Sequence, residues 1–125
     1  MNRTGFRLFG SKPLQEPSEL FFTAIDNANI PEIKKYLKQR KFKINQLDSN
    51  GNTAVHRALF KHCSLREPEA NKYIEVMIQL GTHKADFNIV NNSGFLPMEI
   101  AHLEYSKDRI TVHMLKLLRC YGATR

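Results

Sequence analysis

Apolar residues recur along the chain at the three- and four-residue spacing that marks one face of an α-helix. The spacing occurs in the same form at three places, in Ile33, Tyr36 and Leu37, in Ile74, Met77 and Ile78, and in Leu115 and Leu118. Successive sets lie 41 residues apart. Recurrence at a fixed distance predicts a chain built from repeated helical units.

A second set of positions repeats with an offset of 43 residues and includes unlike residue types. It aligns Ile44 with Phe87, Asn45 with Asn88, Asp48 with Asn91, Gly51 with Gly94, Val55 with Met98 and Ala58 with Ala101. A fainter copy lies upstream, where Phe21 and Ala24 precede Val55 and Ala58 by 34 residues. The chain therefore divides into three units, each with a helix, a short turn, a second helix and a polar loop.

The offsets also place an insertion and the unit boundaries. The first helices of units one and two lie 34 residues apart but the second helices lie 41 apart, which puts seven extra residues inside the middle unit. We assign them to residues 60–72, where Pro68 interrupts the helical pattern. The predicted organisation is a flexible basic arm at 1–17 and a repeat domain at 18–125, with units at about 18–47, 48–90 and 91–125.

The loop and first helix of the middle unit resemble an ankyrin repeat, whose signature at this place runs D-x-x-G-x-T-P-L-H-x-A. The family's places are filled by Asp48, Gly51, Thr53, His56 and Ala58, while Ala54 and Val55 replace its Pro and Leu. The third unit matches at Gly94, Pro97, Met98 and Ala101, with Leu96 and Glu99 in place of the Thr and the His. The resemblance covers about residues 18 to 125 and is weakest in the first unit.

The resemblance implies an all-α fold, an ankyrin-repeat solenoid of helix-turn-helix units with short β-hairpin-like loops. In such a fold Thr53 caps its helix, Pro97 occupies a first turn, and His56 bonds backbone so that one repeat's loop is tied to the next. Gly51 and Gly94 are expected at positive φ in the loop turns. These residues therefore need no catalytic explanation.

The composition is that of a folded domain in a reducing compartment. Of the 125 residues 42% are hydrophobic and 25% are charged, and no apolar run approaches the about 18–20 residues that span a membrane. Cys63 and Cys120 are the only cysteines, too few for a secreted scaffold of this size. We expect an intracellular protein, cytoplasmic or nuclear. Ankyrin proteins of infecting bacteria and viruses add delivery into a host cell as an alternative.

The sequence carries none of the common signatures of a catalytic or cofactor site. G-x-S-x-G, H-E-x-x-H and a phosphate-cradling glycine-rich loop are all missing. His62 beside Cys63 lacks the second ligand pair that a zinc site requires. We therefore predict a protein without enzymatic activity, metal or cofactor, present as a monomer.

The ankyrin resemblance implies a protein-protein interaction module, an adaptor, inhibitor or recruiting factor that binds a protein partner through loop tips and its concave face. The positions that the repeat leaves for binding are Asp26, Asn27, Ser49, Asn50, Asn52, Phe60, Lys61, Asn92, Ser93, Phe95, Leu103 and Glu104. Phe60, Phe95 and Leu103 are the candidate anchors, because large apolar side chains inside a polar rim dominate binding energies. The alternative for each is a place in the hydrophobic core.

Charge adds an alternative partner class. The chain carries a formal net charge of +7, and six cations crowd one run, namely Lys34, Lys35, Lys38, Arg40, Lys41 and Lys43. Such a patch attracts nucleic acid or an anionic membrane. The same residues also fit a solvated outer face, because Ile33, Tyr36 and Leu37 already form the buried stripe of that helix.

Overall fold

The computed structural model describes residues 17–124 and is helical over that range, without a strand. Its α-helices are α1 (Pro17–Asp26), α2 (Ile30–Leu37), α3 (Ala54–Ser64), α4 (Lys72–Thr82), α5 (Pro97–Ser106) and α6 (Val112–Cys120). A 3₁₀ turn, η1 (Glu69–Asn71), precedes α4. The predicted all-α class is confirmed. The arm predicted at residues 1–17 lies, apart from Pro17, outside the described residues.

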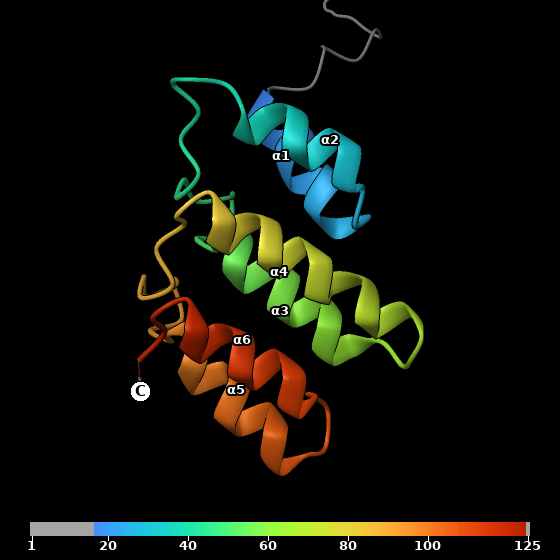
Figure 1. Ribbon diagram of the computed structural model, residues 1–125. Coiled ribbons are helices and arrows are strands. Elements are labelled where there is room, and N and C mark those ends of the chain that lie inside the picture. The colour runs from blue at the N-terminus through green and yellow to red at the C-terminus, as the bar shows by residue number, and fades with distance from the viewer. Residues whose placement is uncertain (1–16, 125) are drawn as a thin grey trace, which may run out of the picture.

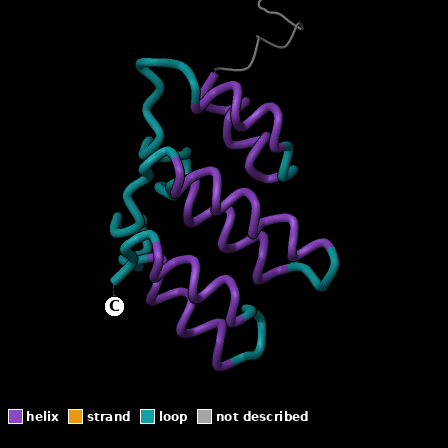
Figure 2. The backbone as a smooth tube through the Cα atoms, viewed as in Figure 1, coloured by secondary structure: helices purple, strands orange, loops and turns teal. Residues whose placement is uncertain are grey.

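The helices form three antiparallel pairs stacked one on another (Figure 1). α1 packs against α2, α3 against α4 and α5 against α6, and the middle pair contacts both of its neighbours. The long connections at 38–53 and 83–96 lie on one side of the stack, and the three shorter turns lie on the other (Figure 2). The three predicted helix-turn-helix units are therefore present as three helix pairs.

Helix starts follow from local side-chain chemistry. The Thr53 hydroxyl accepts the backbone N–H of His56 at the start of α3, and Thr111 caps α6 in the same way. Asn29 caps α2, and Pro97 begins α5 with a φ already suited to the first turn. The predicted cap at Thr53 and the predicted helix start at Pro97 are confirmed.

The buried core runs through all three pairs as one cluster. Ile33, Met77 and Leu118 of the predicted helix faces are fully buried. The predicted Ile74 and Ile78 are only partly buried, and the buried face of α4 is completed by Tyr73, Val76 and Leu80. Ala58 and Ala101 are fully buried as well, and their small side chains allow neighbouring helices to approach closely. Burial stabilises such a stack by about 25 cal/mol per Å² of apolar surface, and each pair needs its neighbour to bury that surface.

The asparagines that repeat in the sequence make similar contacts at two places in the stack. The Asn45 side chain accepts the backbone N–H of Asp86 at 2.8 Å. The Asn88 side chain accepts the backbone N–H of Thr124 at 2.9 Å and donates to the carbonyl of Gly122 at 2.9 Å. Each long connection is thereby bonded to the segment that follows the next helix pair, so the 43-residue register reflects a repeated contact.

The extra residues of the middle unit lie later than the sequence predicted. The predicted range of 60–72 was wrong at its start, because α3 continues to Ser64 and the longer connection comprises residues 65–71. His62 and Cys63 are buried and extend the covered face of α3 by one more turn, which keeps this segment helical. The insertion thus lengthens both the end of α3 and the turn between α3 and α4, on the side opposite the long connections (Figure 1).

The tip of each long connection is a tight turn. Asp48 accepts the backbone N–H groups of Asn50 and Asn52 at 2.8 and 2.9 Å, and its own N–H donates to the carbonyl of Asn52 at 2.8 Å. Gly51 and Gly94 adopt the predicted positive φ, +77° and +86°. The expected turns are therefore present, but no strand flanks them within residues 17–124.

Alanine at the two tip glycines should separate backbone strain from crowding. Gly94→Ala should lower the free energy of unfolding by about 1–2 kcal/mol, because φ is positive there although a Cβ meets no atom within 4 Å. Gly51→Ala should lower it slightly further, because its Cβ would meet the exposed Asn92 amide, which has to rotate away. Urea denaturation measures both losses. The additional loss in Gly51→Ala should vanish when Asn92 is also replaced by alanine. Equal losses in the two single variants would contradict the contact between Gly51 and the Asn92 side chain.

Candidate interaction surface

An arginine on α3 joins the first unit to the second. Arg57 Nε donates to Asp26 Oδ1 at 3.1 Å, its Nη2 also contacts the Asp26 carboxylate, and its Nη1 donates to Asp48 Oδ2 at 2.8 Å. The guanidinium lies 5.2 Å from the centre of the Phe22 ring. The Tyr73 hydroxyl on α4 donates to the Asp26 carbonyl. The end of α1 is therefore held to α3, to α4 and, through Arg57, to the tip at Asp48.

The charges in this cluster stabilise one another. Burial alone would raise the pKa of Asp48, but the backbone N–H groups of Asn52 and Asn50 and the Arg57 guanidinium outweigh burial and lower that pKa. Burial alone would lower the pKa of Arg57, but hydrogen bonds to Asp26 and Asp48 outweigh it and raise that pKa. Arg57 and Asp48 are therefore both charged at neutral pH and act as a fixed ion pair.

This cluster lies at a shallow hollow of about 400 Å³ between α1, α3 and the tip of the first long connection. The hollow is lined by Asp26, Asp48, Asn50, Asn52, Arg57, Phe60, Lys61 and Ser64. Five of these were predicted as binding positions, namely Asp26, Asn50, Asn52, Phe60 and Lys61. The structure therefore brings predicted residues from two units to one place, which we call the Arg57 hollow.

Several predicted positions take part in internal contacts. The Asp26 carboxylate binds Arg57, and the Asn52 side chain accepts a hydrogen bond from Asn91 at 3.0 Å. The backbone N–H of Asn92 donates to the carbonyl of Gly51 at 3.2 Å. Asp26, Asn52 and Asn92 therefore hold units together, which the expectation of binding positions did not include. Asn27, Ser49, Asn50 and Ser93 are exposed at turns.

The three predicted apolar anchors are exposed. Phe60 and Phe95 are each 39% exposed and Leu103 is 50% exposed. Phe60 and Leu103 occupy equivalent positions on α3 and α5, which pack against each other. Beside Leu103, the half-buried Glu104 lies 3.7 Å from the Lys107 ammonium. Apolar side chains with polar neighbours thus extend over units two and three.

A buried histidine connects two of these anchors. The His56 ring centre lies 6.5 Å from that of Phe60, and its Nε2 lies 3.0 Å from the carbonyl oxygen of Phe95. The Thr53 N–H donates to Nδ1 at 3.3 Å, so Nε2 carries the proton and donates to Phe95. The predicted role of His56 in tying one loop to the next is confirmed. Burial lowers the pKa of His56 and keeps the ring neutral.

Sequence reasoning missed Arg57, Asp48 and Ser64 of the hollow. Asp48 stands in the repeat signature, but the signature assigns it to the tip turn and gives no sign of its bond to Arg57. Arg57 occupies a position that the signature leaves open, so its pairing with Asp26 depends on the packing of α1 against α3. Nothing in the sequence marked this side chain.

The cysteines and histidines do not assemble a metal site. Within residues 17–124 no group of three or more His, Cys, Asp or Glu side chains is placed to hold a metal ion. Cys63 is buried, which raises its pKa to about 12, so it is a protonated thiol at neutral pH. Cys120 is exposed and also free of a disulfide.

The basic run forms an exposed patch on α2 and the loop after it. All six cations, Lys34, Lys35, Lys38, Arg40, Lys41 and Lys43, are exposed. None of them has a carboxylate within 4.0 Å among the residues that the structure describes. The Phe42 ring in their midst lies 4.7 Å from the Phe21 ring, centre to centre, and is partly buried against the core.

Comparison of the chain with known protein families, with curated proteins and with solved structures finds no match. A search of the helices between residues 17 and 124 for one that combines the length and apolar character needed to cross a bilayer is also negative.

Removing the Arg57 side chain should test the junction between units one and two. Arg57→Met should lower the free energy of unfolding by about 1–3 kcal/mol, because it leaves the nearly buried Asp48 carboxylate without its cation. Lys107→Met, which breaks an exposed pair at 3.7 Å, should change it by under about 0.5 kcal/mol. Chemical denaturation at neutral pH compares the two. Equal effects would show that the Arg57 cluster contributes no more than a surface ion pair.

Proposed function

We propose that the chain is an ankyrin-repeat solenoid of three divergent repeats that binds a protein partner and catalyses no reaction. The ankyrin assignment is supported by the signature at residues 48–59 and by the contacts of its residues. Thr53 caps α3, Gly51 has positive φ, and His56 donates to the next loop at Phe95. Stacked repeats of this kind are binding scaffolds whose surface residues determine the partner.

The observation that carries the binding proposal is the set of exposed apolar anchors Phe60, Phe95 and Leu103. Large apolar side chains at the centre of a polar rim supply most of the energy of typical protein interfaces. The rim here comprises Ser49, Asn50, Lys61, Asn92, Ser93 and Glu104. We propose that the partner inserts an apolar side chain between these anchors and hydrogen-bonds to the loop tips.

The polar groups of the Arg57 hollow favour a scaffold over a catalytic centre. Catalysis needs a group poised to accept or donate a proton, or a nucleophile beside a base. In the hollow the carboxylates of Asp26 and Asp48 both bind Arg57. Both ring nitrogens of the nearby His56 are hydrogen-bonded to backbone groups. Side chains whose hydrogen bonds are all made inside the chain hold the units in place and are not free to react. A monomer in the reducing interior of a cell, cytoplasmic or nuclear, fits the two cysteines, which form no disulfide.

A second candidate function rests on the basic patch at Lys34–Lys43. Its six cations are exposed and lack a neighbouring carboxylate in the described part of the chain, so they present uncompensated positive charge. Nucleic acid or an anionic lipid surface would bind such a patch by releasing counterions. The Phe42 ring in the run is partly covered by its contact with Phe21, so stacking with bases has little support, which makes this the weaker candidate.

Partner capture from cell extract with anchor variants tests the main proposal. Phe60→Ala and Leu103→Ala should each weaken partner binding about 10-fold, because each removes an exposed apolar anchor worth about 1–2 kcal/mol. Val112→Ala is the matched control, since Val112 is 52% exposed but begins α6, a helix that carries none of the anchors. Binding equal in all four proteins, or no captured protein at all, would refute the proposed face.

Salt dependence tests the second candidate. If the patch binds nucleic acid or acidic vesicles, affinity should fall at least 100-fold between about 50 and 200 mM salt, and Lys34→Gln with Lys38→Gln should reduce the slope. Lys72→Gln with Lys84→Gln, outside the patch, should leave the slope unchanged. Fluorescence anisotropy with a labelled oligonucleotide and vesicle flotation measure the two ligands. Binding that is insensitive to salt would exclude the patch.

A further inference from the structure

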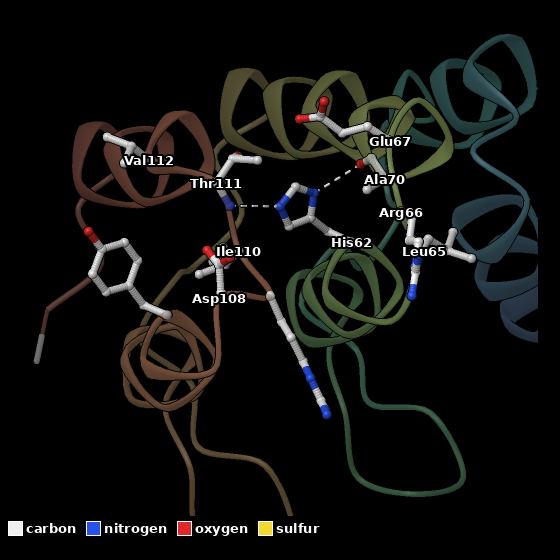
Figure 3. A pocket seen from close by; sticks show the side chains of 11 residues that line it. His62, Leu65, Arg66, Glu67, Ala70, Asp108, Ile110, Thr111 and Val112 are labelled. Atoms are coloured by element: carbon white, nitrogen blue, oxygen red, sulfur yellow. Dashed lines mark hydrogen bonds between the residues drawn. The ribbon is translucent and has the colours of Figure 1, made fainter.

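A second buried histidine joins the middle unit to the third at the turn end of the stack. His62, on the last turns of α3, is 1% exposed. Its Nδ1 lies 2.9 Å from the carbonyl oxygen of Ala70 in η1, and the backbone N–H of Thr111 points at its Nε2 from 3.3 Å (Figure 3). One imidazole thus bridges the inserted connection and the segment that begins α6.

The two contacts fix the protonation state of the ring. A backbone N–H can only donate, so Nε2 must present its lone pair to Thr111, and the proton must lie on Nδ1, where it donates to Ala70. An imidazolium carries protons on both nitrogens and can accept nothing. The bond from Thr111 therefore exists only while His62 is neutral, whereas the bond to Ala70 is kept when the ring is protonated.

His56 has the opposite polarity across the same boundary. Its accepting nitrogen faces Thr53 in its own unit, whereas its donating nitrogen faces Phe95 of the third unit. Protonation of His56 would remove the bond from the Thr53 N–H, although the Thr53 hydroxyl 2.8 Å from Nδ1 can turn to accept, and it would retain the bond that crosses the boundary. Protonation of His62 would do the reverse, because its crossing bond is the accepted one from Thr111. The two ends of one interface therefore respond differently to acid.

A hollow of about 650 Å³ lies beside His62, between the inserted connection and the α5–α6 turn (Figure 3). The charged and titratable groups that line it with His62 are Arg66 and Glu67 on the inserted connection, Tyr105 on α5, and Asp108 and Arg109 on the α5–α6 turn. The negative charges of the two carboxylates roughly cancel the positive charges of the two guanidinium groups. Burial therefore has the largest effect on the protonation state of His62. The hollow gives protons a route to a ring that is otherwise enclosed.

We propose that the His62–Thr111 contact is an acid-sensitive hinge. When His62 gains a proton it releases the backbone of Thr111, and the α5–α6 turn separates from the middle unit while the loop tips stay joined through His56. The hollow widens as the turn moves. This device is independent of whether the chain binds a protein partner, because it depends only on contacts inside the chain.

The environment of the His62 ring determines whether acid or base opens the hinge. Burial lowers the pKa of His62, and the Ala70 carbonyl and the Glu67 charge only partly oppose it. A histidine whose pKa is lowered in the folded chain stays neutral at and above pH 6.5, its ordinary pKa, and the Thr111 bond is intact there. The stability that this bond contributes is lost as pH falls below 6.5. The hinge is therefore closed at neutral pH and opens in mild acid.

Amide hydrogen exchange of the full chain, resolved by NMR between pH 7.5 and 5, tests the hinge. Once His62 titrates, the protection factor of the Thr111 amide, corrected for intrinsic exchange, should fall up to 10-fold per pH unit. The Asn92 amide, which donates to Gly51 at the tip end, should keep its protection. Thr111 protection that is constant over this range, or that falls together with Asn92, would overturn the proposal.

His62→Gln supplies the matched variant, because its amide can donate to Ala70 and accept from Thr111 without titrating. Thr111 protection should then be independent of pH, whereas His102→Gln, at an exposed histidine on α5, should retain the wild-type profile. An unchanged profile in His62→Gln would refute the hinge. If that variant does not fold, the ring signals of His62 in the wild type must titrate with the midpoint of Thr111 deprotection, and separate midpoints would refute it equally.

Discussion

The middle helix pair has to bury apolar side chains on both of its faces, and neither face can be covered from within the pair. Val55, Ala58 and Leu59 on α3 are all at most 1% exposed, because α1, α4 and α5 surround that helix. The outer pairs each contribute one covering face. Stability therefore belongs to the stack as a whole, and the energy comes from apolar burial across two boundaries between pairs.

Polar contacts then fix how the pairs sit on one another, and three of them start from α3. Arg57 reaches back to Asp26 of the first pair, while His56 and His62 reach forward to Phe95 and Thr111 at the two ends of the third. Apolar faces slide easily, whereas hydrogen bonds to a particular carbonyl or N–H specify one register. The same rigidity holds the exposed side chains of α3 and the tips in fixed relative positions.

Much of this arrangement could be predicted from the sequence because it rests on local rules. Apolar spacing gave the helices, Thr53 and Pro97 gave two helix starts, and Gly51 and Gly94 gave the turns. The end of α3 was missed, since Phe60 to Ser64 stay helical only because the third pair and η1 cover His62 and Cys63.

The candidate surface was predicted only in part, for the same reason. Exposure of Phe60, Phe95 and Leu103 follows from their place in the repeat. The engagement of Asp26 by Arg57, and of Asn52 by Asn91, depends on side chains brought together over 31 and 39 residues. Such pairs have no local signature in the sequence, so Asp26 and Asn52 were predicted as binding positions.

Nuclear Overhauser contacts in the full chain decide whether the three pairs stack in this order. The stack requires cross peaks between Gly51 and the Asn92 side chain at one boundary and between the Tyr73 ring and Asp26 at the other. Intact helices that lack both sets of cross peaks, or that place Gly51 and Gly94 in unrelated surroundings, would contradict the account.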